Sequence, residues 1–441
     1  MKHRSWSILI VAPAAILANC ARSGSPPTAD RSLSPSCQAA LAPGGHTEPI
    51  DRTIAALQEQ ARQSPRKREA LEQLGYRFVT RARLANDPGA YTLVERVASC
   101  IDEQHPGDPA SLLLRGHALH QLHRFSEAEA IARTLVTKRE FVLDYALLGD
   151  VLMQQGRLTE AAAAYQKMID LKPFYQSYTR AAHLRWLMGD LDGAIQLIHD
   201  AIASASPRDP EAIAWAYTRL ALYELQRGDL NRATGAIDSA LTFQPEYPAA
   251  LLARGRVLLA QNRFSDAAAV LERAATRNPL PEYQWALSDA LRRDGREQEA
   301  VSVERELMEH GAATDPRTVA LFLATRRLDN QQALALSESE LGVRRDVFTE
   351  DARAWALAAA GRLEEARDPM DRALSAQTND ARLFLHAGVI AASTGRRADA
   401  RRWFTQAERF RSTLLPSELR ILHAYQHASS PSPSPVSRRE S

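Results

Sequence analysis

The chain has 441 residues, of which 45% are hydrophobic and 24% charged, and its formal net charge at pH 7 is +2. This balance is typical of a folded protein and excludes a polyelectrolyte that would bind nucleic acid through charge alone. A length of 441 residues favours two or three globular domains, unless the chain grows by stacking repeats, which needs no such division.

Residues 1–19 have the pattern of a signal peptide. The start is basic, and the apolar stretch 6–17 is too short to span a bilayer comfortably. The stretch ends just before Cys20 and resembles a bacterial lipobox, although Asn19 replaces the small residue usual before the cysteine. The resemblance implies that Cys20 is lipidated and anchors the protein in the cell envelope, facing the periplasm. The alternatives are an ordinary secretory signal and an uncleaved anchor, and both also take the protein out of the cytoplasm.

A spacer rich in serine, proline and glycine follows, and we expect residues 20–50 to form a flexible tether. Cys37 lies in this spacer, whereas Cys100 lies in a helical pattern. If Cys20 carries lipid, these two are the even pair left in an oxidising compartment. Two free thiols are the alternative, because a cysteine in a flexible segment need not meet a partner. The sequence leaves both possibilities open.

Three helical patterns fill residues 51–108. Apolar residues recur at helical spacing from Ile54, from Leu71 and from Tyr91, and residues 86–89 form a clear turn before the third pattern. We expect the last two patterns to make a divergent repeat at the N-terminal end of the array that follows.

The clearest unit of the chain is the stretch 142–174, in which two helical patterns meet at a turn. Gly156 ends the first helix and turns the chain, and Pro173 stops the second. In the second helix, Ala161 permits a close helix crossing, and Tyr165 fills the space beside it. The unit therefore predicts a pair of antiparallel, tightly packed helices.

The order of residues in this unit resembles the tetratricopeptide (TPR) repeat. Apolar, small and helix-stopping residues stand at the positions that the family uses: Tyr145, Leu148, Gly149, Leu152, Ala161, Tyr165 and Pro173. The departures, which include leucine for the usual tyrosine and tyrosine for the usual phenylalanine, are conservative in volume. The resemblance implies an all-α fold, a right-handed TPR solenoid built as a superhelix of helix-turn-helix hairpins.

The unit recurs along the chain. The alanine five residues after each turn falls at Ala128, Ala161, Ala194, Ala233, Ala267, Ala300, Ala333, Ala366 and Ala400. Neighbours are 33 or 34 residues apart, except for a spacing of 39 that we attribute to a longer loop at 204–210. The turn residues keep step at His123, Gly156, Gly189, Gly228, Asn262, Gly295, Leu328, Gly361 and Gly395. We therefore expect the array to fill residues 109–413, with its weakest unit around Leu328.

Two short segments follow the array. Residues 414–428 have one apolar side and a helix start at Pro416, so we expect a helix that caps the last repeat. The tail 429–441 is low in complexity, and we expect it to be disordered.

Catalytic and cofactor motifs are missing from the sequence. It has no phosphate-binding loop, dinucleotide fingerprint, HExxH, GxSxG or paired CxxC pattern, and we expect neither an enzyme nor a cofactor. His117 and His120 lie one helical turn apart, so a metal or small-ligand site could join them with Asp150 or His183. The favoured interpretation is that these histidines line a polar groove, because no thiolate or tight carboxylate completes a metal site.

The TPR resemblance implies an interaction scaffold that binds a peptide segment or a protein partner in its concave groove. The first helix of each hairpin lines that groove, and the candidates in the N-terminal half are His117, His120, Gln121, Asp150, Met153, Gln154, Thr179, His183 and Trp186. The C-terminal half offers the more charged set Arg256, Asp289 and Arg292, so we expect the partner in the N-terminal half. Envelope assembly, secretion and pilus biogenesis are the processes that the resemblance suggests, and the sequence does not select among them.

Overall fold

The computed structural model describes residues 33–44, 49–64, 68–85 and 89–429, and within these ranges the chain is helical with no strand. The predicted signal peptide, Cys20 and residues 430–441 lie outside the described residues. Four helices precede the array: α1 (Pro35–Leu41), α2 (Pro49–Gln63), α3 (Arg68–Ala85) and α4 (Gly89–Gln104). No described helix combines the length and the apolar character needed to span a membrane.

Nine helix-turn-helix hairpins follow in the described part of the chain. Their first helices are α5 (Pro109–Gln121), α7 (Val142–Gln154), α9 (Tyr175–Leu187), α11 (Pro210–Arg227), α13 (Pro248–Ala260), α15 (Pro281–Arg293), α17 (Pro316–Arg326), α19 (Val347–Ala359) and α21 (Ala381–Ser393). Their second helices are α6 (Phe125–Lys138), α8 (Leu158–Leu171), α10 (Leu191–Ser204), α12 (Leu230–Phe243), α14 (Phe264–Arg277), α16 (Glu297–His310), α18 (Asn330–Val343), α20 (Arg367–Ser375) and α22 (Arg397–Arg409). Short 3₁₀ turns occupy Gly311–Ala313 and Arg411–Thr413, and α23 (Pro416–Ser429) ends the described chain. The predicted all-α solenoid is confirmed.

The predicted turn residues adopt the left-handed conformation that reverses the chain between the two helices of a hairpin. In eight of the nine hairpins the residue with positive φ is the predicted one, with φ between 58° and 87°. In the weakest unit the prediction was one residue late, because Arg327 rather than Leu328 has φ 54°. Helix α17 has only 11 residues and ends at Arg326, so its left-handed residue comes earlier than the alanine spacing suggests.

The break in the repeat spacing also differs from the prediction. Residues 205–209 make a loop only slightly longer than its neighbours, and most of the extra length lies in α11, which has 18 residues where α9 has 13. An apolar stripe and an aspartate cap at Asp209 extend this helix at its N-terminal end. The inserted residues therefore lengthen a helix of the inner surface instead of a loop.

Helices within a hairpin approach closely at the predicted small residues. The landmark alanines are buried, from Ala128 at 0% exposure to Ala400 at 5%. A Cβ added at Gly149 would lie 2.3 Å from the ring of Tyr165. Glycine is therefore required there because the tyrosine of the second helix occupies the space of a side chain.

The predicted tether, 20–50, is shorter than expected. Helix α1 begins at Pro35, where Ser34 caps it, and its residues Ala40 and Leu41 are buried in a cluster shared with α4. Cys37 and Cys100 form a disulfide with Cα atoms 4.8 Å apart. This bond settles the choice left open by the sequence, because α1 packs on the folded body and brings the two thiols together.

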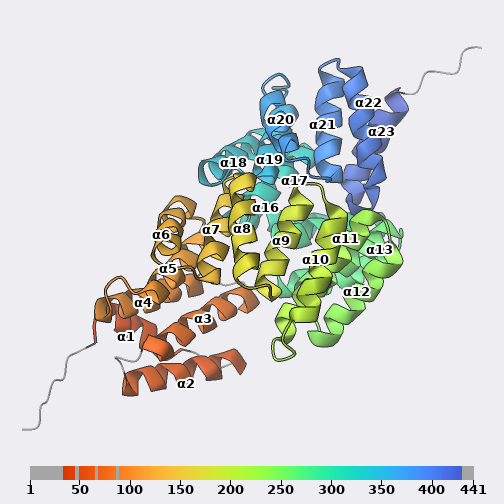
Figure 1. Cartoon of the computed structure of the whole chain (residues 1–441). Coiled ribbons are helices and arrows are strands. Elements are labelled where there is room, and N and C mark those ends of the chain that lie inside the picture. Colours follow the sequence, from red (N-terminus) through yellow and green to blue (C-terminus); the bar gives the residue numbers. More distant parts are fainter. Residues whose placement is uncertain (1–32, 45–48, 65–67, 86–88, 430–441) are drawn as a thin grey trace, which may run out of the picture.

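The superhelix curves until its later hairpins, α13 to α22 with α23, stack on its earlier hairpins, α5 to α12. The earlier hairpins are called the first turn and the later ones the second turn. Helix α19 begins beside the C-terminal end of α7, where the backbone N–H of Arg345 donates to the carbonyl of Gln154 at 3.2 Å. One hairpin further, Thr378 Oγ1 donates to the Leu187 carbonyl at 2.5 Å, and after the next hairpin Ser412 Oγ donates to the Leu225 carbonyl at 2.5 Å. The segments before α19, α21 and α23 thus meet the ends of α7, α9 and α11 (Figure 1).

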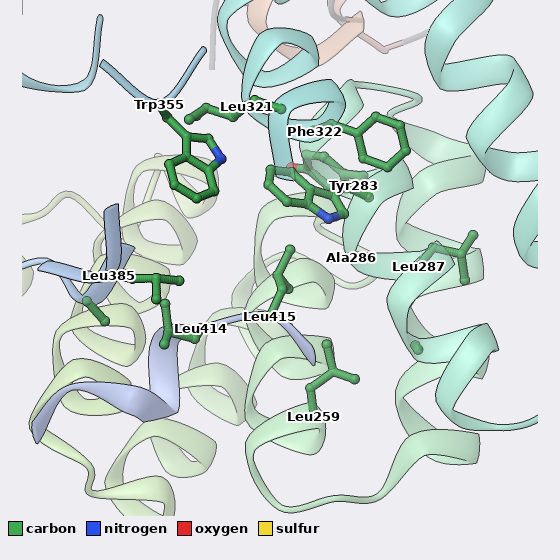
Figure 2. Packing of buried hydrophobic residues seen from close by; sticks show 14 of the residues in the cluster. Leu259, Tyr283, Ala286, Leu287, Leu321, Phe322, Trp355, Leu385, Leu414 and Leu415 are labelled. Atoms are coloured by element: carbon green, nitrogen blue, oxygen red, sulfur yellow. The ribbon is translucent and has the colours of Figure 1, made fainter. Parts of the chain in front are cut away.

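Helix α23 does more than the predicted cap, because it packs on α15 and α17 as well as on α21 and α22. Leu414 and Leu415, which precede it, are buried in the largest apolar cluster together with Trp285 and Leu385. Figure 2 shows side chains of α13, α15, α17, α19 and α21 gathered around these two leucines. The C-terminal end of the array is therefore packed against α13, α15 and α17 in its central part.

Candidate functional site

The predicted groove residues lie on the inner surface of α5, α7 and α9, and all of them are partly or fully buried. Thr179 is 7% exposed and donates to the Gln176 carbonyl at 3.2 Å. Met153 packs against the apolar cluster of α5 to α8. Gln121 Nε2 lies 3.3 Å from His120 Nδ1. These side chains contact one another and the rest of the chain. This half of the predicted groove is therefore largely filled by side chains of the protein itself.

An ion pair fixes the centre of this surface. Arg180 of α9 donates to both carboxylate oxygens of Asp150 on α7, at 2.8 Å from Nε to Oδ1 and 2.8 Å from Nη2 to Oδ2. Tyr165 Oη donates to the same carboxylate at 2.7 Å. Burial raises the pKa of Asp150, but Arg180 and these hydrogen bonds outweigh it and leave the pKa lowered. Asp150 is therefore a charged structural link between two hairpins.

The histidines of this surface are held neutral. Burial lowers the pKa of His117 to about 3, and burial with the nearby guanidinium of Arg219 lowers the pKa of His183 to about 3. His183 Nδ1 lies 3.3 Å from Arg219 Nη2 and can accept a hydrogen bond from this N–H. Among the described residues no group of three or more His, Cys, Asp or Glu is placed to hold a metal ion.

Trp186 and Gln154 lie where the two turns of the superhelix touch. Trp186 stacks on Phe348 of α19 with ring centroids 5.8 Å apart, and its Nε1 donates to Gln226 Oε1 at 2.6 Å. Gln154 accepts hydrogen bonds from the backbone of Arg345 and from the side chain of Arg344. These two groove candidates therefore join the turns of the chain to each other.

A cavity of about 160 Å³ opens instead inside the second turn. Its walls come from the inner faces of α13, α15, α17, α19 and α21 and from Leu415, and its lining includes the aromatic rings of Trp285 and Phe348. The charged residues that line it are Arg256, Glu282, Asp315, Arg317, Asp351, Asp380 and Arg382. Of the more charged C-terminal set, Arg256 lines the cavity, whereas Asp289 is buried behind it at 2% exposure.

The arginines of the cavity each have a carboxylate partner. Arg256 Nη2 lies 2.7 Å from Glu282, and Arg317 Nη1 lies 3.1 Å from Asp346. Arg382 pairs with Glu418 of α23, a carboxylate that is only 1% exposed. The guanidinium charges are thus balanced by residues of this chain.

Sequence reasoning missed most of this set, although one signal was present. Asp315 and Arg317, and again Asp380 and Arg382, form an Asp-x-Arg pattern at the start of a first helix. In each case the aspartate caps the helix and the arginine reaches the inner surface. The other charged residues of the cavity lie on other hairpins. The sequence could not group them, because only the curvature of the superhelix brings these hairpins together.

Residues 113–175, 218–280 and 252–315 match the tetratricopeptide-repeat family. Among curated proteins, none matches the chain. Among solved structures, it is similar to MamA, with 17% identity and a TM-score of 0.31 over 39% of this chain and 92% of that one. It is similar to a monomeric IFIT1 mutant with m7Gppp-AAAA, with 14% identity and a TM-score of 0.47 over 82% and 86%. A thermophilic TPR protein of Thermus thermophilus is similar at 20% identity and a TM-score of 0.36 over 44% and 99%.

Proposed function

Because this chain is a tetratricopeptide-repeat protein, and such repeats serve as scaffolds for protein interaction, we propose that it is a cell-envelope scaffold that holds a peptide segment or protein partner on its inner surface. The protein is exported, anchored by lipid on Cys20, and faces the periplasm. Envelope assembly, secretion and pilus biogenesis are the processes that such a scaffold would serve.

The disulfide between Cys37 and Cys100 carries the proposal of export. Disulfides persist in oxidising compartments and are rare in the cytosol. Here the bond joins α1, directly after the tether, to α4 at the start of the array. A covalent link at this place holds the folded body to the tether, which suits a protein attached to a membrane by its N-terminus.

The inner surface of α5 to α9 supports the proposal of a partner. Asp150 and Arg180 keep 16% and 25% of their side-chain surface exposed, although they are paired. His117 and His183 are partly buried and neutral, so they offer hydrogen bonds without an added charge. Trp186 is already packed against Phe348, and a partner that uses it must first separate the two turns.

Two experiments test these proposals separately. Cys20→Ser should move the protein from the membrane fraction to the soluble periplasm or medium, and retention in the membrane fraction would contradict lipid anchoring. A photo-crosslinking residue at His117 should trap a specific envelope protein, whereas the same residue at His199, on the outer face of α10, should not. Equal trapping at both positions, or none at His117, would contradict binding on the inner surface.

A further inference from the structure

We propose that the cavity of the second turn is a binding site for a single cationic group, a guanidinium or an ammonium. An anion or an apolar group does not suit this cavity, because carboxylates outnumber arginines around it. The inference does not depend on the scaffold function, because a free organic cation and a basic side chain of a protein partner would present the same group.

The first argument for the cation site is the charge of the cavity wall. Arg256, Arg317 and Arg382 are each matched by one carboxylate. Three further carboxylates, those of Asp315, Asp351 and Asp380, also line the cavity and have no arginine of their own within ion-pair distance. A buried excess of negative charge is costly unless a cation or a proton compensates it.

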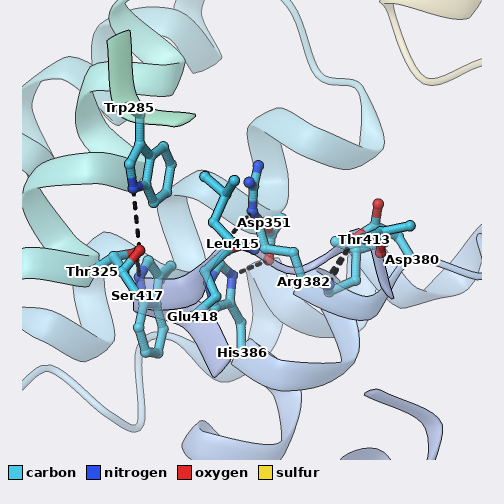
Figure 3. A network of polar contacts seen from close by, with 12 residues as sticks. Trp285, Thr325, Asp351, Asp380, Arg382, His386, Thr413, Leu415, Ser417 and Glu418 are labelled. Carbon is cyan, nitrogen blue, oxygen red and sulfur yellow. Dashed lines mark hydrogen bonds and ion pairs between the residues drawn. The ribbon is translucent and has the colours of Figure 1, made fainter. Parts of the chain in front are cut away.

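The second argument for the cation site is that two carboxylates of the wall have free acceptor atoms. Asp351 is 1% exposed, and His386 Nδ1 lies 2.8 Å from its Oδ1 (Figure 3). Asp380 accepts two backbone N–H groups through Oδ1, from Arg382 at 2.8 Å and Leu383 at 3.1 Å. No hydrogen bond from a described residue reaches Oδ2 of either carboxylate. Burial raises the pKa of Asp380, although the nearby guanidinium of Arg382 acts in the opposite direction.

The third argument for the cation site is that the side chains of the cavity wall are held in place. Asp380 is fixed as a helix cap, and Asp351 is fixed by His386, whose ring stacks on Trp355 with centroids 4.1 Å apart. Trp285 and Phe348 line the same space, and two arginines of the chain already lie over these rings, Arg382 at 5.1 Å from the Trp285 centroid and Arg317 at 5.9 Å from the Phe348 centroid. Trp285 is itself held by its Nε1 donating to Ser417 Oγ at 3.2 Å. The wall is therefore pre-organised.

The volume limits the ligand. A cavity of about 160 Å³ is smaller than the roughly 300–1,000 Å³ of pockets that hold drug-sized ligands, and it suits one guanidinium with a short aliphatic stem. It is too small for a folded element or a nucleotide. The site thus accepts one cationic group, either the end of a basic side chain or one end of a small free amine.

The test is isothermal titration calorimetry of the full chain with agmatine, and in parallel with the peptide Gly-Arg-Gly. We expect one site for at least one of the two, with no binding of acetate or of the uncharged analogue isopentanol. Binding of agmatine indicates a free cation as a possible occupant, and binding of the peptide alone indicates a partner's side chain. Absence of binding by both cations, or binding of acetate in their place, would overturn the proposal.

Matched variants locate the site. Asp351→Asn and Asp380→Asn keep the shape of the side chain, and asparagine also caps a helix, so each variant should fold. Each should weaken cation binding by about tenfold or more, because a hydrogen bond to a charged group is lost. Asp229→Asn, at the cap of α12 and away from the cavity, should bind as the wild type does. Unchanged affinity in both cavity variants would overturn the proposal even if the cation binds.

Discussion

The inner surfaces of the two turns of the superhelix are built from the same helical positions but use their charges differently. In the first turn, Asp150 and Arg180 pair with each other, and His117 and His183 stay neutral, so charge is balanced. In the second turn, carboxylates are in excess around a cavity, as at Asp380. The comparison teaches that the repeat determines where the inner side chains lie, whereas the balance of their charges differs between the turns. The excess of carboxylates in the second turn is the basis of the proposed cation site.

The largest loss of stability is expected when the buried ion pair between Asp289 and Arg326 in the second turn is removed. Asp289 is 2% exposed, lies 2.5 Å from Arg326, and accepts hydrogen bonds from the backbone and hydroxyl of Ser417. Asp289→Ala should lower the free energy of unfolding by about 3–5 kcal/mol, because Arg326 loses a buried partner and α23 loses its anchor. Chemical denaturation followed by circular dichroism measures this.

The matched control for that change is Asp266→Ala. Asp266 pairs with Arg263, and both side chains are more than half exposed at 56% and 58%. An exposed pair of this kind contributes little, so the denaturation midpoint should hardly move. Equal losses in the two variants would mean that the buried contact does not hold the second turn.

The next effect concerns the contact between the turns. Trp186→Ala should lower the free energy of unfolding by about 3 kcal/mol, because the ring packs on His183 and Phe348. In a double-mutant cycle, Trp186→Ala and Phe348→Ala should couple by about 0.5–1.5 kcal/mol. Trp215, a tryptophan of α11, packs on the apolar cluster of α9 to α13, and Trp215→Ala should show no coupling with Phe348→Ala. A cycle without coupling for Trp186 would argue against stacked turns in solution.

Two turn glycines sharpen the comparison further. Gly189 and Gly295 both have positive φ, 80° and 83°. A Cβ at Gly189 would lie 2.5 Å from the Gln377 carbonyl oxygen, whereas a Cβ at Gly295 would meet nothing within 4 Å. Gly295→Ala should cost about 1–2 kcal/mol for the left-handed backbone, and Gly189→Ala about 1–3 kcal/mol more for overpacking. Melting curves that show equal losses would contradict the contact between the turns.

The smallest effect is a difference in the response to acid. The pKa of His117 and of His183 is lowered from 6.5 to about 3, so the unfolded chain binds more protons and stability falls as pH drops from 6.5 towards 3. Burial raises the pKa of Asp289 and of Asp380, so protonation of these groups favours the folded second turn as pH falls towards their unfolded value of 3.8.

Hydrogen exchange at pH 7.5 and 5.5 separates the two responses. Protection of α5 to α9 should fall at the lower pH, by about 1 kcal/mol for each histidine per pH unit below 6.5. Protection of α15 to α21 should stay or rise. His117→Gln should remove part of the loss in the first turn, whereas His199→Gln, on an exposed position of α10, should leave it unchanged.

The sequence by itself determined the hairpins. Landmarks such as Ala161, turn residues such as Gly156 and the packing of Gly149 against Tyr165 are local features, because each repeat buries its own helix crossing. Periodicity therefore predicted every hairpin, and it failed by one residue at Arg327, where a shortened helix moved the turn. For the same reason the predicted groove residues fall on α5, α7 and α9, the first helices of their hairpins.

Only the tertiary structure decided how the hairpins meet after a full turn. The curvature accumulates from small rotations at each repeat, so no local pattern shows that Trp186 meets Phe348 or that Gln154 meets Arg345. The disulfide of Cys37 likewise depended on where α1 packs. The cavity of the second turn joins residues of five hairpins with Leu415, and it exists only because the superhelix closes around it.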